Sequence, residues 1–129
     1  MHRTQPNILV IAGSSECTCL IEKLVGLGAV TSVLTAEEAL RSLKSEDFDV
    51  AFCAWELDGA TWQDLLRSLK THRVEVPVII YYHCGGEAEW MKALEAGAFD
   101  MLAPPFDRCQ LSALLEQATS SAERAKQLA

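Results

Sequence analysis

Short apolar runs alternate along the chain with longer segments in which apolar residues recur three and four positions apart. A short apolar run bounded by turn residues predicts a strand buried on both faces, as at the centre of a parallel sheet. The three-and-four spacing predicts an amphipathic helix with one buried face. On this basis we expect strands at residues 7–12, 29–34, 50–55, 76–82 and 99–103.

The helices expected between these strands have apolar faces and suitable residues at their ends. Thr35, Thr61 and Asp107 are expected N-caps, and Gly97 is expected to end the helix over residues 87–96. The residues predicted to face the core are Cys17, Leu20, Ile21 and Leu24; Ala36, Ala39, Leu40 and Leu43; Trp62, Leu65, Leu66 and Leu69; Met91 and Leu94; and Leu111, Leu114, Leu115 and Ala118.

This alternation predicts an α/β fold. It implies a doubly wound, five-stranded parallel sheet with right-handed crossovers, a flavodoxin-like three-layer sandwich with helices on both faces. The pattern alone does not fix the strand order. The 129 residues, half of them hydrophobic, favour one domain over residues 1–129, with its core at about 7–117. Residues 118–129 are helix-prone and polar, which fits a helical tail or the start of a linker.

Charge and hydropathy narrow the class of protein. The net charge of −7 argues against direct nucleic-acid binding, which needs a basic face. The apolar runs are far shorter than the roughly 20 residues of a membrane span, and residues 1–6 are polar, without the apolar core of a signal peptide. We therefore expect a cytoplasmic protein that binds other proteins and does not associate with a membrane.

The five cysteines do not form a metal-binding or disulfide pattern. An odd number without a CxxC pair fits reduced thiols in a cytoplasmic protein. Cys17 and Cys19 are close in sequence, but helix residues two apart point about 200° apart and do not converge on one ion. We expect no metal site there.

The central apolar run, Val50–Trp55, breaks into an acidic loop at residues 56–59. In open α/β sheets, ligands and chemistry lie just past the carboxyl ends of such strands. The function of the domain should therefore depend on what stands at Ala54 and around it.

Several short stretches, in order and at the right spacing, resemble the receiver domain of two-component response regulators. The resemblance covers about Asn7 to Gln117, and the stretch at residues 93–100 is the most specific. The resembling stretches are Ile8–Ile11, Glu37–Leu40, Phe48–Val50, Pro77–Ile80 and Ala93–Asp100, the last followed by Pro105, Phe106 and Asp107.

Receiver domains carry a phosphorylation site at the carboxyl edge of the sheet. Two acidic residues after the first strand hold Mg²⁺, an aspartate ending the third strand accepts the phosphoryl group, and a hydroxyl residue and a lysine bind its oxygens. Here the acidic pair falls on Ala12 and Gly13, and the acceptor falls on Ala54. The hydroxyl position falls on Tyr82 and the lysine position on Pro104.

The resemblance therefore implies a degenerate receiver. It would not be an enzyme, and we expect no Mg²⁺ or other cofactor. It would act in two-component signalling through protein contacts, independently of aspartyl phosphorylation. In one alternative, Glu56 or Asp58 replaces the missing acceptor as a displaced carboxylate.

A second alternative is a small-ligand pocket at the remodelled edge. Trp55, Tyr82 and His83 are expected to meet there, and residues 13–15 could offer backbone N–H donors at a helix N-terminus. Because protein interiors are densely packed, we favour bulky side chains that simply fill the vacated space.

The family's output surface comprises the fourth helix, the fifth strand and the last helix. The resemblance places Met101 at the aromatic position of that strand, and Trp90 on the fourth helix is the residue we expect to dock a partner, with Phe106 bordering it. Trp90 could equally complete the core stripe with Leu94. The expected partners are signalling proteins, a fused output domain or a second copy of the chain.

Overall fold

The computed structural model describes residues 6–12, 18–57, 60–81, 87–102 and 106–128. The strands are β1 (Asn7–Ile11), β2 (Ala29–Val33), β3 (Val50–Ala54), β4 (Glu56–Leu57), β5 (Ala60–Thr61), β6 (Val78–Tyr81) and β7 (Asp100–Leu102). The helices are α1 (Thr18–Val25), α2 (Ala36–Ser45), α3 (Trp62–Thr71), α4 (Glu87–Glu95) and α5 (Arg108–Leu128).

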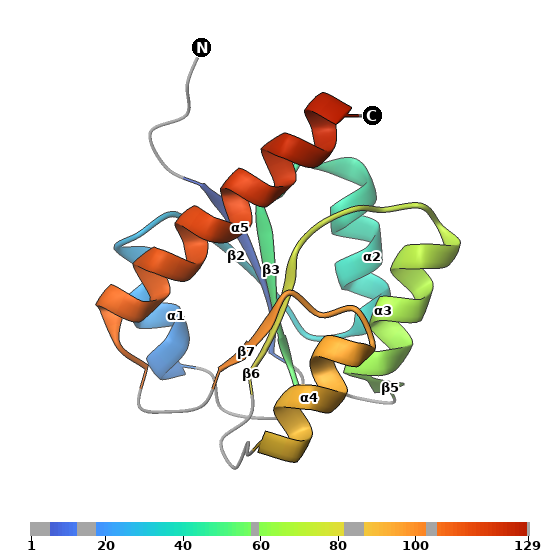
Figure 1. Ribbon diagram of the computed structural model, residues 1–129, viewed down its shortest axis with the longest axis horizontal. Helices are drawn as coiled ribbons and strands as arrows, with labels where there is room; N and C mark the ends of the chain where they lie inside the picture. Colours follow the sequence, from blue (N-terminus) through green and yellow to red (C-terminus); the bar gives the residue numbers. More distant parts are fainter. Residues whose placement is uncertain (1–5, 13–17, 58–59, 82–86, 103–105, 129) are drawn as a thin grey trace.

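The main sheet has five parallel strands in the order β2-β1-β3-β6-β7. Across the sheet, the step from β1 to β2 runs in one direction, and the steps from β2 to β3, from β3 to β6 and from β6 to β7 run in the opposite direction. Right-handed crossovers therefore place α1 on one face of the sheet and α2, α3 and α4 on the other. Figure 1 shows this arrangement, with α5 covering the same face as α1. The predicted doubly wound, three-layer fold is confirmed.

The core is centred on β3, as the continuous apolar run predicts. All five residues of this strand are at most 1% exposed, because strands lie on both sides of it and helices on both faces. The predicted inner positions Leu20, Leu24, Leu65 and Leu111 are fully buried.

Each of the five predicted strands is shorter in the structure by at least one residue, and one helical face is shifted. β6 begins only at Val78, because Pro77 has no N–H to donate; its carbonyl accepts the Ala51 N–H at 2.9 Å. Met91 was predicted to face the core, which is wrong, since it is 49% exposed. Ala93, fully buried, takes the core-facing position of α4 instead.

The predicted helix ends are confirmed where the structure describes them. The Thr35 hydroxyl accepts the Glu38 N–H at 3.1 Å, and the Asp107 carboxylate accepts the Cys109 N–H at 3.1 Å. Gly97 has a φ of +105° beyond the end of α4, a conformation that glycine adopts without steric cost.

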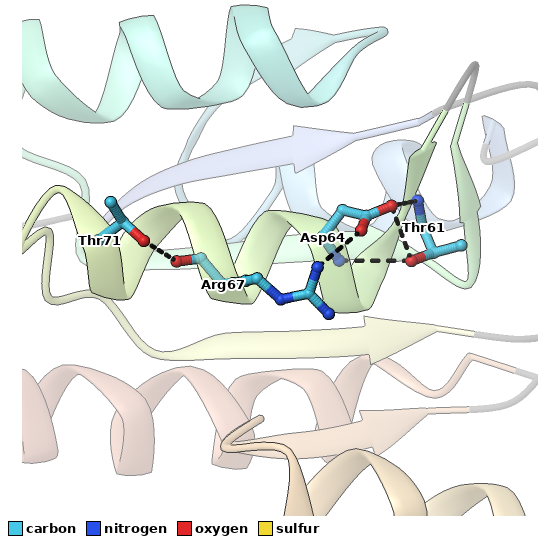
Figure 2. Close-up of polar contacts among 4 residues, drawn as sticks. All are labelled: Thr61, Asp64, Arg67 and Thr71. Atoms are coloured by element: carbon cyan, nitrogen blue, oxygen red, sulfur yellow. Dashed lines mark hydrogen bonds and ion pairs between the residues drawn. The ribbon is translucent and has the colours of Figure 1, made fainter.

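At the start of α3, Thr61 and Asp64 form a reciprocal capping box. The Asp64 N–H donates to the Thr61 hydroxyl at 3.3 Å, and the Thr61 N–H donates to the Asp64 carboxylate at 2.9 Å. Figure 2 shows this pair with Arg67, one turn along, whose guanidinium lies 3.5 Å from Asp64. The capping box therefore sets the residue at which the chain, after β3 and the short β4–β5 hairpin, enters α3.

The pKa of the Asp64 carboxyl is lowered by the Thr61 backbone N–H, then by the Thr61 hydroxyl and the Arg67 charge. A carboxyl with a depressed folded-state pKa adds stability above its unfolded pKa and loses it as the pH falls through the folded value. We expect Asp64→Asn to be less stable than the parent at pH 6 and the difference to shrink towards pH 3.

Urea unfolding at pH 6, 4 and 3 measures this difference. Glu116→Gln, which removes an exposed carboxylate on α5, is the matched control. A stability difference between Asp64→Asn and the parent that stays constant over this pH range would contradict the role of the carboxylate charge.

Candidate functional site

Two alanines stand at the carboxyl edge of the sheet, where receiver chemistry is expected. Ala54 is the last residue of β3 and is 1% exposed, and Ala12 follows β1 and is 6% exposed. A methyl group offers neither a nucleophile nor an oxygen ligand for a cation. The other predicted positions of this edge, Gly13, Tyr82 and Pro104, lie outside the described residues.

Between β3 and α3 the chain forms a small antiparallel hairpin that was not predicted. β4 pairs with β5 through Glu56 opposite Thr61 and Leu57 opposite Ala60. Two residues, one of them the candidate Asp58, separate the strands and lie outside the described residues. An Asp-Gly pair between short strands is a recognised hairpin signal, and it could have revealed this element.

The hairpin is anchored to the core by tryptophans. Trp55 follows β3, and its ring centroid lies 5.1 Å from that of Trp62, with the rings tilted by 46°. Trp62 is 2% exposed and begins α3. We predicted that Trp55 would meet Tyr82 and His83, both of which lie outside the described residues. The structure shows its ring against Trp62 and its main-chain N–H donating to the Tyr81 carbonyl at 3.0 Å.

A buried tyrosine on β6 crosses this edge of the sheet. The Tyr81 hydroxyl donates to the main-chain carbonyl of Ile11, on β1, at 3.3 Å, and the residue is 5% exposed. A buried phenol needs a hydrogen-bond partner, so its presence in a buried strand was a signal that some acceptor lies nearby. Sequence reasoning followed the neighbouring Tyr82 and missed this contact.

Two other buried polar side chains have structural explanations. Burial raises the pKa of the Cys53 thiol far above its ordinary range, so this thiol stays protonated and unreactive. Asp49, 5% exposed, lies at the amino end of β3, away from Ala54, and accepts the Asn7 N–H at 2.7 Å. Within the described residues, no three His, Cys, Asp or Glu side chains come together to hold a metal ion.

A second candidate surface lies over α4 and β7. Trp90 is 44% exposed, and its indole N–H donates to the Asp100 carboxylate at 3.1 Å. The same carboxylate oxygen accepts the Met101 N–H at 2.8 Å. The Trp90 indole therefore reaches β7, while Met101 and Phe106 are half-buried and pack against the core.

The sequence profile of the response regulator receiver domain matches residues 6–116. The chain belongs to the response regulator receiver domain family. It is similar to transcriptional regulatory protein ZraR of Salmonella typhimurium, at 31% identity over 123 residues covering 92% of this chain. It is 30% identical to the DNA-binding transcriptional regulator NtrC of Escherichia coli K12, covering 93% of this chain.

These relatives are longer proteins, since the matched region is 27% of ZraR and 26% of NtrC. Among solved structures, the signal receiver domain of an HD domain-containing protein from Pseudomonas fluorescens Pf-5 superposes with a TM-score of 0.82. That match covers 98% of this receiver domain and 96% of the other chain at 21% identity, which supports the fold. In the part of the receiver domain that is described, no helix has the length and hydropathy to span a membrane.

Proposed function

We propose that this receiver domain regulates a two-component pathway through protein contacts and independently of aspartyl phosphorylation. The observation that carries the proposal is Ala54, a buried methyl group at the end of the central strand. This is the position at which the family resemblance expects the acceptor aspartate.

The surroundings of Ala54 support the same conclusion. Ala12 gives the neighbouring strand no carboxylate for Mg²⁺, so neither the nucleophile nor this ligand of the phosphorylation site is present. The backbone of Glu56 is committed to the β4–β5 hairpin. We therefore propose that the domain needs no Mg²⁺ or other cofactor and catalyses no reaction of its own.

The surface through which we propose that it signals is the Trp90 surface, defined as Trp90, Met101 and Phe106. The longer relatives suggest that partners include an output domain in the same protein, and a second copy or a separate signalling protein in the cytoplasm would use the same contacts. Because the domain carries a net charge of −7, we propose no direct contact with nucleic acid.

The proposal is tested by intact mass spectrometry after incubation with Mg²⁺ and acetyl phosphate. An ordinary receiver domain with its acceptor aspartate is treated in parallel as the control. We expect no mass gain on this chain while the control gains one phosphoryl group, because Ala54 has no nucleophile at the acceptor position.

A stoichiometric gain of one phosphoryl group on this chain would overturn the proposal. The variants Glu56→Gln and Asp58→Asn would then locate the displaced acceptor, since loss of labelling in one of them identifies the carboxylate. Labelling that survives in both would direct the search to another residue.

A further inference from the structure

Tyr81 belongs to a row of residues that cross the sheet at one level. In the parallel register, Ala54 of β3 is the partner of Tyr81 of β6, and Cys53 is the partner of Ile11 of β1. Continuing the second register by one residue places Ala12 beside Ala54. Aligned residues of neighbouring strands project to the same face, so Ala12, Ala54 and Tyr81 share one face of the sheet.

The Tyr81 hydroxyl reaches past the strand next to it. β3 lies between β6 and β1, which are therefore two strand spacings, about 10 Å, apart. The hydroxyl is nevertheless 3.3 Å from the Ile11 carbonyl oxygen on β1. Tyr81 is level with Ala54 of β3, and Ile11 is level with the preceding residue, Cys53. On the face that Tyr81 shares with Ala54, the direct path of the phenol from β6 to the Ile11 oxygen therefore crosses β3 at Ala54.

We infer that the phenol of Tyr81 lies across Ala54 and closes the acceptor position of this receiver. A side chain larger than alanine at position 54 would occupy the space that the ring crosses, so Tyr81 and Ala54 form a matched large–small pair. Both residues are at most 5% exposed, which is expected if each covers the other.

The inference deepens the proposed function. It rests on that function only in treating Ala54 as a lost acceptor position, since the packing of Tyr81 is argued from the structure itself. The phosphorylation site has not merely lost its carboxylate; its space is filled by the ring of Tyr81, which ties β6 to β1. Beside this edge, the rings of Trp55 and Trp62 contact each other at the two ends of the loop that follows β3. A ring across Ala54 also opposes the small-ligand alternative at that position, because it takes up the space beside the alanine methyl group.

A double-mutant cycle tests the pairing through folding stability, without any phosphate donor. Ala54→Val is expected to raise the unfolding equilibrium constant at least tenfold in the parent, because the added methyl groups collide with the ring. In a Tyr81→Ala background the same substitution is expected to change that constant less than threefold, since the ring is gone. The difference between the two backgrounds measures the contact.

Ala51→Val is the matched control, because Ala51 is a fully buried alanine of the same strand, three residues from Ala54 and on the opposite face. Its effect should be the same with and without Tyr81. If Tyr81→Ala does not fold, Tyr81→Leu replaces it, since leucine is too short to cross β3. Equal effects of Ala54→Val in both backgrounds would overturn the inference.

The Tyr81→Phe variant separates the ring from its hydrogen bond. It should keep the coupling to Ala54→Val while losing the contact with the Ile11 carbonyl. If Ala54→Val has equal effects in both backgrounds and the domain remains unphosphorylated, the packing of Tyr81 over Ala54 is contradicted and the proposed function is not. Conversely, phosphorylation of a displaced carboxylate, with the coupling between Tyr81 and Ala54→Val intact, would contradict the proposed function alone.

Discussion

Replacing Trp62 by alanine is expected to lower the free energy of unfolding by about 3–5 kcal/mol, the usual cost of truncating a large buried aromatic side chain. Trp62 is among the largest fully buried side chains, at 2% exposed, and its ring contacts Trp55 beside the candidate site. Its removal would leave a cavity between α3 and the sheet and take away the anchor of the β4–β5 hairpin.

Urea unfolding followed by circular dichroism measures this loss. Trp62→Phe is the matched control, since it keeps an aromatic ring at the same position and should cost clearly less than Trp62→Ala. A second measurement is hydrogen exchange, in which the amides of the β4–β5 hairpin should lose protection in Trp62→Ala before the global unfolding transition. A cost near 1 kcal/mol, typical of losing a helix cap, would contradict the anchoring role.

The alternation of strands and helices could be predicted because each element carries its own period. The α3 stripe of Trp62, Leu65, Leu66 and Leu69 is buried as predicted, since the three-and-four spacing leaves one way to cover it. The flavodoxin-like architecture was expected from the alternation, but the strand order β2-β1-β3-β6-β7 comes from the structure, because periodicity records which face of an element is buried and not which strand lies beside it.

The differences arise where tertiary packing decides between local possibilities. Met91 and Ala93 both suit an apolar position of α4, and the short side chain is the one that faces the sheet, which leaves Met91 exposed. The contact of Tyr81 with the Ile11 carbonyl joins residues 70 positions apart, and no local pattern encodes it. The residues at the carboxyl edge could be named from sequence, but what fills the edge depends on which strands are neighbours.

The exposed indole of Trp90 has the properties of an anchor for a partner. Trp90 is 44% exposed, yet its indole N–H is held by the Asp100 carboxylate, which also accepts the Met101 N–H. A large aromatic side chain that is already ordered loses little conformational freedom on binding. Exposed tryptophans of this kind are enriched among the residues that dominate binding energy.

We therefore expect Trp90→Ala to weaken the binding of a protein partner by about 30-fold or more, or about 2 kcal/mol, with little change in folding stability. The measurement is quantitative capture of partners by the immobilised domain from an extract of its source cells, followed by titration of the captured protein. Val25→Ala is the matched control, since Val25 is an exposed apolar residue, 59% accessible, on α1 and away from the Trp90 surface. Equal affinity of the parent, Trp90→Ala and Val25→Ala would show that the partner binds elsewhere, and Trp90 would then serve mainly to order β7 through Asp100.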